Sequence, residues 1–429
     1  MTMSDPASEL SAAVTSGDAG AVRAILERYP EVKATLDEPM PGGSFDQQAL
    51  LIAVGRGKKD VVDALLDAGA DINVRSRWWA GGFSVLEAAD PALVPYLIER
   101  GAEVNASAAA KLGMLEALDR LLTERPALVH ARGGDGQTPL HVASTVAIAQ
   151  LLLDYGAEID ARDIDHESTP AQYLVRDHQD VTRYLITRGC QTDILMAAAV
   201  GDLPLVRLHL DADPARIRTS VSPAFFPKKN PRSGGTIYTW TLGADKTAHA
   251  VARDFGHLDV LAELMARSPA TLQLAVAGAA GDESAVRDLL ARDPRLLSSL
   301  SDKERGVLAD AARDNDLRAV KAMLAAGWPV DARGQHHATP LHWAAWNGNS
   351  EMIRELIRHR APVDVKGDEY DGTPLGWALY GCVHGWHCRT GDYAGVVEAL
   401  IAAGAQAPAV TPQLEVSEAV RAVLERRPG

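Results

Sequence analysis

The chain has 429 residues, 57 of them acidic and 43 basic, and its formal net charge is −14. Such an acidic chain is poorly suited to general binding of nucleic acids or acidic membranes, so we expect neither partner. A single compact core rarely grows to this length, whereas a repeat architecture avoids the limit because each unit contacts only its neighbours.

Cysteine content and hydropathy favour a soluble, cytoplasmic protein. The three cysteines, Cys190, Cys382 and Cys388, form no disulfide framework and fit a reducing compartment. The N-terminal segment MTMSDPASELSAAV lacks the basic and apolar regions of a signal peptide. No uninterrupted apolar run approaches the roughly 18 residues that a membrane-spanning helix needs.

A short motif recurs along the chain and marks the starts of predicted helices. TPLHVAS at 138–144 returns as TPLHWAAWNGN at 339–349, and thinner copies begin at Thr169, Thr247 and Thr373. The interval from Thr138 to Thr169 is 31 residues, and a period in the low thirties is typical of stacked helix pairs. In each copy the threonine can cap the first turn, and the proline that often follows needs no hydrogen-bond acceptor there.

Other predicted units begin differently, with a helix of small residues followed by Gly-Asp and a Val-rich helix. Asp18, Asp202, Asp282 and Asp316 stand where an aspartate would cap the second helix of its pair. About twelve helix pairs result, and Val420 and Leu424 lie on one face of a final capping helix within 407–429. The approximate pairs are 8–38, 39–75, 76–105, 106–135, 136–165, 166–193, 194–245, 246–270, 271–302, 303–335, 336–370 and 371–406.

Between 163 and 166 the sequence Asp-Ile-Asp-His lies in a connection just before a first helix. Carboxylates beside an imidazole can perform acid–base chemistry, although aspartates in such loops commonly make turn hydrogen bonds. By the same spacing, Asp331, His336 and His337 should lie near Asp368 and Tyr370. We therefore name His336, His337 and Tyr370 as candidate binding residues.

The longest interruption of the period is the segment 218–246, which joins the second helix of one pair to the first helix of the next. We call such connections fingers, and this one the long finger. Aromatic and basic side chains gather in it and could hold a partner's acidic segment or an anionic or planar ligand. Alternatively, its aromatic residues pack on the neighbouring unit. Thr236–Trp240 alternates like a strand, which suggests a small hairpin. The candidate binding residues are Phe225, Phe226, Lys228, Lys229, Arg232, Tyr238 and Trp240.

A second interruption, 381–390, separates two helices of one pair and contains Cys382, His384, His387 and Cys388. Thiolates and imidazoles are zinc ligands, but the spacing is more compressed than in ordinary zinc sites. A folded loop without metal is the preferred interpretation. Five of the eight tryptophans fall in the last 110 residues, where they could form a binding surface or fill the core.

The motif at 138–141, its fuller copy at 339–345 and the Gly-Ala endings resemble those of ankyrin repeats. The segments 168–185 and 372–381 are also similar to uncharacterised bacterial ankyrin-repeat proteins. The resemblance implies an all-α solenoid that continues from 1 to 429, with N-terminal repeats over 8–217 and C-terminal repeats over 246–406. It further implies that His141 and His342 bridge backbone groups of adjacent turns, and that the concave face and fingers bind other proteins.

We therefore expect a non-enzymatic scaffold that binds a partner protein. The alternative is a small-molecule binder or enzyme with a pocket between the long finger and the helices. Phosphate-binding loops and the common hydrolase motifs are absent, so no catalytic residue and no cofactor are predicted.

Overall fold

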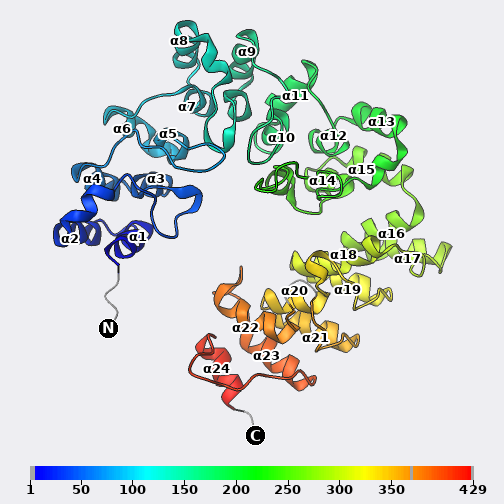
Figure 1. Cartoon of the computed structure of the whole chain (residues 1–429). Coiled ribbons are helices and arrows are strands. Elements are labelled where there is room, and N and C mark those ends of the chain that lie inside the picture. Colours follow the sequence, from blue (N-terminus) through cyan, green and yellow to red (C-terminus); the bar gives the residue numbers. More distant parts are fainter. Residues whose placement is uncertain (1–4, 368–370, 427–429) are drawn as a thin grey trace. The chain divides into compact units, whose positions relative to one another are not determined.

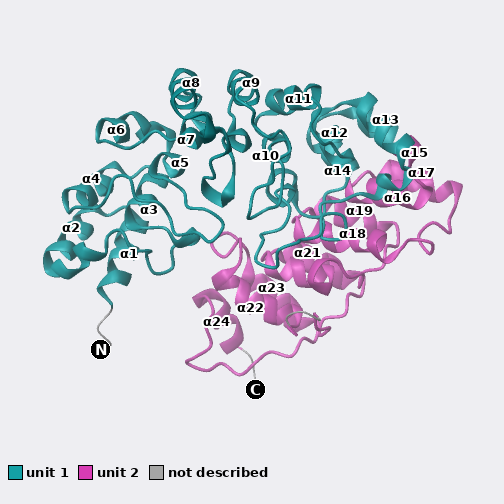
Figure 2. Cartoon of the chain, turned by 45° about the horizontal axis from the view of Figure 1, so that its top comes forward, with its two compact units in different colours: residues 1–264 teal, residues 265–429 magenta. Residues whose placement is uncertain are grey.

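A computed structural model describes residues 5–367 and 371–426. The chain divides into two compact units, 1–264 and 265–429, which Figure 2 distinguishes by colour. The described residues form helices and loops without a named strand, and their β-type pairing is limited to two isolated bridges, Arg75 with Ser84 and Ser220 with Thr247. The predicted all-α fold is confirmed. No described helix combines the length and apolar character that crossing a bilayer requires.

The helices of the first unit follow one another in pairs (Figure 1). They are α1 (Pro6–Ser16), α2 (Ala19–Arg28), α3 (Ala49–Gly55), α4 (Lys59–Asp67), α5 (Val85–Ala88), α6 (Val94–Glu99), α7 (Ala106–Lys111), α8 (Leu115–Glu124), η6 (Pro139–Val142), α9 (Val146–Asp154), α10 (Pro170–Leu174), α11 (Gln179–Thr187), α12 (Ile194–Val200), α13 (Leu203–Ala212), α14 (Ala248–Asp254) and α15 (Leu258–Arg267).

The second unit continues the pattern and ends on a single helix. Its helices are α16 (Ala270–Ala279), α17 (Glu283–Arg292), α18 (Asp302–Arg313), α19 (Leu317–Ala325), α20 (Pro340–Trp346), α21 (Ser350–Arg358), α22 (Pro374–His384), α23 (Tyr393–Ala402) and α24 (Glu418–Glu425). Short helical turns join the pairs: η1 (Pro30–Thr35), η2 (Ser44–Asp46), η3 (Pro91–Leu93), η4 (Pro126–His130), η5 (Gly134–Gly136), η7 (Pro214–Arg218), the π-helical η8 (Thr239–Gly243) and η9 (Gln335–His337).

Two rows of helices stack within each unit. First helices contact first helices, as in α1–α3–α5–α7 and α16–α18–α20–α22, and second helices contact second helices, as in α19–α21–α23. The amphipathic α21 shows why: Met352, Ile353 and Leu356 are buried, whereas Glu351 and Arg354 on the opposite side are exposed. Twelve pairs appear in the described residues, and Val420 and Leu424 of α24 are buried against the end of the second unit.

The repeated motif acts as the sequence indicates. The backbone N–H of Thr339 donates to Nδ1 of His342 (3.2 Å), and the other ring nitrogen lies 3.0 Å from the carbonyl oxygen of Gly372 in the next finger. His141 makes the same two bonds, to Thr138 and to the carbonyl of Ser168. The predicted bridging role of both histidines is confirmed.

The predicted aspartate caps are present as well. Each of the four side chains accepts a 2.9 Å hydrogen bond from the backbone N–H three residues ahead, which satisfies a donor that the helix itself leaves free. The capping residues are Asp18, Asp202, Asp282 and Asp316.

Candidate functional site

Five fingers of the first unit lie side by side and form what we call the finger row: 43–48, 75–84, 132–137, 162–168 and the long finger. Hydrogen bonds join neighbours, from Gln48 Nε2 to the carbonyl of Arg75 (3.1 Å) and from the backbone N–H of Gly234 to the carbonyl of Asp165 (2.9 Å). The carbonyl of Asp135 accepts from two N–H groups of the 162–168 finger at 3.0 and 3.1 Å. The fingers at 75–84 and 132–137 are neighbours by close approach, since a Cβ at Gly81 would lie 2.3 Å from the carbonyl oxygen of Gly133.

Long and short connections compensate for one another in this row. The connections 101–105 and 188–193 are short, and the neighbouring ones, 68–84 and 213–247, are long. The long finger contacts the short 188–193 connection through Tyr238 and extends beyond it to the finger at 162–168. Because the 188–193 connection is too short to form a finger, the long finger takes the position next to the finger at 162–168.

Main-chain contacts hold the long finger in place. The carboxylate of Glu167 accepts hydrogen bonds from the backbone N–H groups of Lys229 (2.8 Å) and Asn230 (2.7 Å). The hydroxyl of Ser168 accepts from the N–H of Ile237 at 3.1 Å. Charge-assisted bonds of the first kind are about twice as strong as neutral ones, so the base of the finger is fixed.

Two of the predicted binding residues serve packing. Tyr238 is fully buried, and its hydroxyl donates to Asp193 Oδ2 at 2.9 Å. Phe226 is half-buried and packs edge-on against the Tyr238 ring, with 5.4 Å between centroids. Burial raises the pKa of the Asp193 carboxyl, while the hydrogen bonds it accepts oppose that shift. For these two aromatic residues the packing interpretation is the one the structure supports.

The predicted hairpin over Thr236–Trp240 is wrong. Residues from Thr239 onward form η8, a π-helical turn, and Thr241 Oγ1 donates to the carbonyl of Gln172 at 3.3 Å. Arg176 donates to the carbonyl of Thr241. Alternation in a short apolar run does not distinguish a strand from a tight helical turn, and here contacts with α10 decide.

The other predicted residues of the long finger face solvent. Trp240 is 72% exposed and Phe225 is 41% exposed. Lys228 and Lys229 are exposed too, and the exposed Arg232 places its guanidinium 4.5 Å from the centre of the Trp79 ring. Trp79 belongs to the finger at 75–84, which the sequence analysis did not single out. The long gap between the Gly-Ala at 69–70 and the next helix could have indicated this second extended finger.

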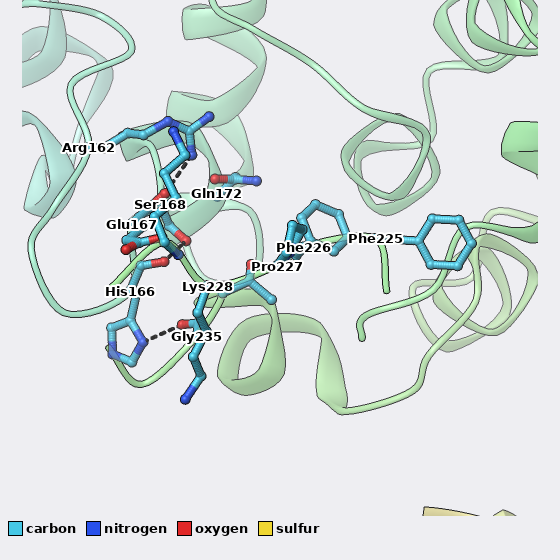
Figure 3. A pocket seen from close by; sticks show the side chains of 12 residues that line it. Arg162, His166, Glu167, Ser168, Gln172, Phe225, Phe226, Pro227, Lys228 and Gly235 are labelled. Atoms are coloured by element: carbon cyan, nitrogen blue, oxygen red, sulfur yellow. Dashed lines mark hydrogen bonds between the residues drawn. The ribbon is translucent and has the colours of Figure 1, made fainter. Parts of the chain in front are cut away.

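A pocket of about 210 Å³ lies where the long finger meets the finger at 162–168. Arg162, Glu167 and Lys228 are among its lining residues, and Figure 3 shows the Phe225 ring directed away from them. Ligand pockets usually measure about 300–1,000 Å³. The carboxylate of Glu167 is already occupied by backbone donors, so this space favours the small-molecule alternative only weakly.

The aspartates and the histidine of 163–166 have separate roles. Asp163 makes turn bonds, since its carboxylate accepts from the N–H groups of His166 (2.6 Å) and Ser168 (2.7 Å). Asp165 and His166 instead gather with Asp135 of the neighbouring finger, and one ligand-type atom from each lies within 4.8 Å of the others. Burial raises the pKa of Asp135 to about 6, although the nearby His166 opposes the shift.

In the second unit, aromatic side chains form a cluster on α20 and α22. Trp343 and Trp377 are buried and meet edge-on at 5.2 Å. Trp346 stacks on Tyr380, which is 58% exposed, and Trp386 stacks on Trp343 while remaining 64% exposed. The packing interpretation therefore holds for Trp343 and Trp377, whereas a binding role for the exposed Tyr380 and Trp386 stays a prediction.

The interruption at 381–390 is only partly a loop, because α22 extends to His384. Cys382 is buried and its thiol donates to the carbonyl of Leu379 at 3.0 Å, whereas the His384 ring packs on Tyr380 at 4.3 Å. Among the described residues, Cys382, His384, His387 and Cys388 do not converge as metal ligands. The zinc interpretation has no support in this arrangement.

The finger at 331–338 carries two of the remaining predicted residues, His336 and His337. His336 has a positive φ of 58° and packs at 6.1 Å from Trp343, and His337 is exposed. Tyr370, the third candidate, lies outside the described residues, as does Asp368. The grouping of these side chains stays a prediction.

Comparison with known proteins agrees with this architecture. A family model described as ankyrin repeats in three copies matches 107–196, 272–366 and 308–407, and a single-repeat model matches 46–77. The matches to the three-copy model cover more than half of the chain, so the chain belongs to the ankyrin-repeat family.

Individual relatives are similar over short stretches. The chain is 32% identical over 117 residues to palmitoyltransferase Hip14 of Drosophila melanogaster, covering 27% of the chain and 17% of that protein. It is 48% identical over 50 residues to the serine/threonine-protein kinase VIK of Arabidopsis thaliana, covering 11% of each. The crystal structure of the human ASB11 ankyrin repeat domain covers 72% of the chain and 100% of that domain, at 20% identity and a TM-score of 0.26.

Proposed function

We propose that the protein is a scaffold that binds a partner protein through the finger row of its first unit. The observation that carries this proposal is the contrast within the long finger. Tyr238 is fully buried, whereas Trp240, two residues later, is 72% exposed. A large apolar ring held in solvent by an anchored backbone is the type of residue that dominates protein interfaces.

The anchoring lowers the cost of binding. Glu167 and Ser168 fix the base of the finger through its backbone, so little loop entropy is lost when a partner docks. Tryptophan and phenylalanine themselves have few rotatable bonds. The finger row therefore presents Trp240 and Phe225 in an ordered state before the partner arrives.

The charges around these rings indicate the partner's chemistry. Lys228, Lys229 and Arg232 are exposed on the long finger of a chain whose net charge is −14. A partner segment with acidic residues beside an apolar anchor would match the finger, while the acidic remainder of the surface would disfavour other acidic proteins. Because Arg232 also stacks on Trp79, the finger at 75–84 belongs to the proposed surface.

Surface variants that leave the fold intact test the proposal. Trp240→Ser with Phe225→Ser removes the exposed rings, and Lys228→Glu with Lys229→Glu reverses the local charge. A matched control, Tyr380→Ser with Trp386→Ser, removes two exposed rings from the second unit. Partners captured by the wild-type chain should be lost with the finger variants and kept with the control. Retention by both finger variants would contradict the proposal.

A further inference from the structure

Asp135, Asp165 and His166 form a compact group of polar side chains inside the finger row, beneath the exposed rings and charges of the proposed partner surface. They come from two neighbouring fingers, and one ligand-type atom from each lies within 4.8 Å of the others. Asp135 and Asp165 are 8% and 5% exposed, and the His166 side chain is 11% exposed. Two carboxylates and an imidazole therefore lie close together and are largely buried.

The carboxylate of Asp135 is the unexplained member of the group. Its Oδ1 is buried and makes no hydrogen bond of ordinary length among the described residues. The indole N–H of Trp78, which lacks such a partner too, is close enough to lower the pKa of this carboxyl, against the larger effect of burial. The neighbouring Arg162 directs its guanidinium to the carbonyl of Glu167 rather than to this carboxylate. A buried carboxylate oxygen without a close donor is costly, so a cation bound at this position would stabilise it.

His166 is oriented as a ligand would be. Its Nδ1 lies 2.8 Å from the carbonyl oxygen of Gly235. A carbonyl can only accept, so Nδ1 carries the proton and Nε2 is left on the side of Asp165, 3.6 Å from its Oδ2. A backbone carbonyl that fixes the ring of a metal-binding histidine in this way is a common supporting contact.

The long finger also orients the side chain of Asp165. Its Oδ1 accepts a 3.1 Å hydrogen bond from the N–H of Gly234, and its Oδ2 faces His166. The long finger thus orients two of the three side chains through Gly234 and Gly235. The candidate ligands thus come from the fingers at 132–137 and 162–168, and the long finger supplies the hydrogen bonds that orient two of them.

From this geometry we propose that Asp135, Asp165 and His166 bind one divalent transition-metal ion of the zinc type. Mixed nitrogen and oxygen ligands suit such ions, whose bonds of about 2.0–2.2 Å need only small side-chain movements to form here. Water completes the coordination. The ion joins the fingers at 132–137 and 162–168 and, through Gly234 and Gly235, secures the long finger.

Titration of the chelator-treated full chain with Co²⁺ and with Zn²⁺ tests this site. We expect one ion per chain, and a cobalt spectrum without a thiolate charge-transfer band. That spectrum distinguishes the site from one built on Cys382 and Cys388. A thiolate band that disappears in Cys388→Ser would overturn the assignment, as would the absence of binding by the wild-type chain.

The decisive variant is Asp135→Asn, which keeps the shape of the side chain and removes its charge. Loss of a direct ligand should weaken binding by more than about 100-fold, the upper end of what loss of a supporting contact costs. Without metal, this variant should melt no lower than the wild-type chain, and added Zn²⁺ should no longer raise its melting temperature. A role in folding alone would instead lower the melting temperature without metal.

Two further variants complete the test. His166→Gln should also lose the metal-dependent rise in melting temperature. Asp331→Asn removes an exposed carboxylate from a finger of the second unit and should bind the ion as the wild-type chain does. Equal affinity in Asp135→Asn, His166→Gln and the wild-type chain would refute the site.

Discussion

The hydroxyl of Tyr238 donates a 2.9 Å hydrogen bond to Asp193, the residue that caps α12. Asp193 thereby serves two purposes, since its other carboxylate oxygen accepts the N–H of Met196 at 2.9 Å. The bond joins the interior of the long finger to α12, the first helix of the pair that directly precedes this finger. It explains how an interruption of the repeat becomes part of the fold.

Tyr238→Phe should therefore destabilise the first unit. The change leaves Asp193 Oδ2 without its partner in a buried place, which costs roughly 1–3 kcal/mol. Urea unfolding followed by circular dichroism measures the effect. Trp240→Phe, at a position that is 72% exposed, should change the free energy of unfolding by less than about 0.5 kcal/mol. Equal effects of the two variants would contradict the packing role of Tyr238.

Gly136 should tolerate a side chain poorly because another finger lies against it. Its φ is +73°, and a Cβ there would lie 2.4 Å from Cγ1 of Ile164. Gly156 has a similar φ of +89° but nothing within 4 Å of such a Cβ. Gly156→Ala should cost about 1 kcal/mol from backbone strain. Gly136→Ala should cost about 1–3 kcal/mol more from the clash.

Thermal melts of these two variants make the comparison. Ile164→Ala in the Gly136→Ala background removes the clashing side chain and should recover most of the difference between the glycines. If both single variants melted at the same temperature, the close approach of the two fingers would be wrong.

The motif histidines should make stability depend on pH. Burial lowers the pKa of His342 to about 4, against an ordinary value of 6.5. The unfolded chain therefore binds a proton that the folded chain rejects between these values, so stability is complete above about pH 6.5 and falls as the pH drops toward 4. The loss is at most about 3 kcal/mol for this group.

The chain itself offers the matched substitution. Gln172 occupies the same position after Thr169 and accepts its N–H at 2.9 Å. His342→Gln should keep the cap at pH 7.5 and lose less stability on acidification to pH 4.5, as measured by urea unfolding at both pH values. A pH dependence identical to that of the wild-type chain would show that His342 is not a source of the effect.

Glu167 should control the order of the long finger. Glu167→Ala removes the acceptor of two backbone N–H groups, and each bond to a charged group contributes about 1.5–3 kcal/mol. Trypsin cuts after lysine, so cleavage at Lys228 and Lys229 should accelerate at least about tenfold. Glu116→Ala, on the exposed side of α8, should leave the rate unchanged. Unaltered cleavage in Glu167→Ala would mean that other contacts hold the finger.

The repeating parts of the fold could be predicted from the sequence because their determinants are local. Thr339 and His342 act within one turn, and Asp282 caps the helix that directly follows it. Such contacts depend on spacing, which a sequence displays. The ankyrin architecture followed from these positions.

The candidate site could be predicted only in part. The long finger was visible as an interruption, but the burial of Tyr238 depends on Asp193 and on contacts with α10, which only the folded chain brings together. The meeting of Asp135 with Asp165 likewise depends on how adjacent fingers align. Exposure of Trp240 beside a buried Tyr238 cannot be read from residue type.

The most direct test of the proposed function is partner capture from a lysate of the source cell, quantified by mass spectrometry. The wild-type chain is compared with Trp240→Ser, Phe225→Ser and with the second-unit control Tyr380→Ser, Trp386→Ser. The proposal predicts a protein that the wild-type chain and the control recover and that the finger variant loses. Recovery of the same proteins by all three chains would contradict binding through the finger row.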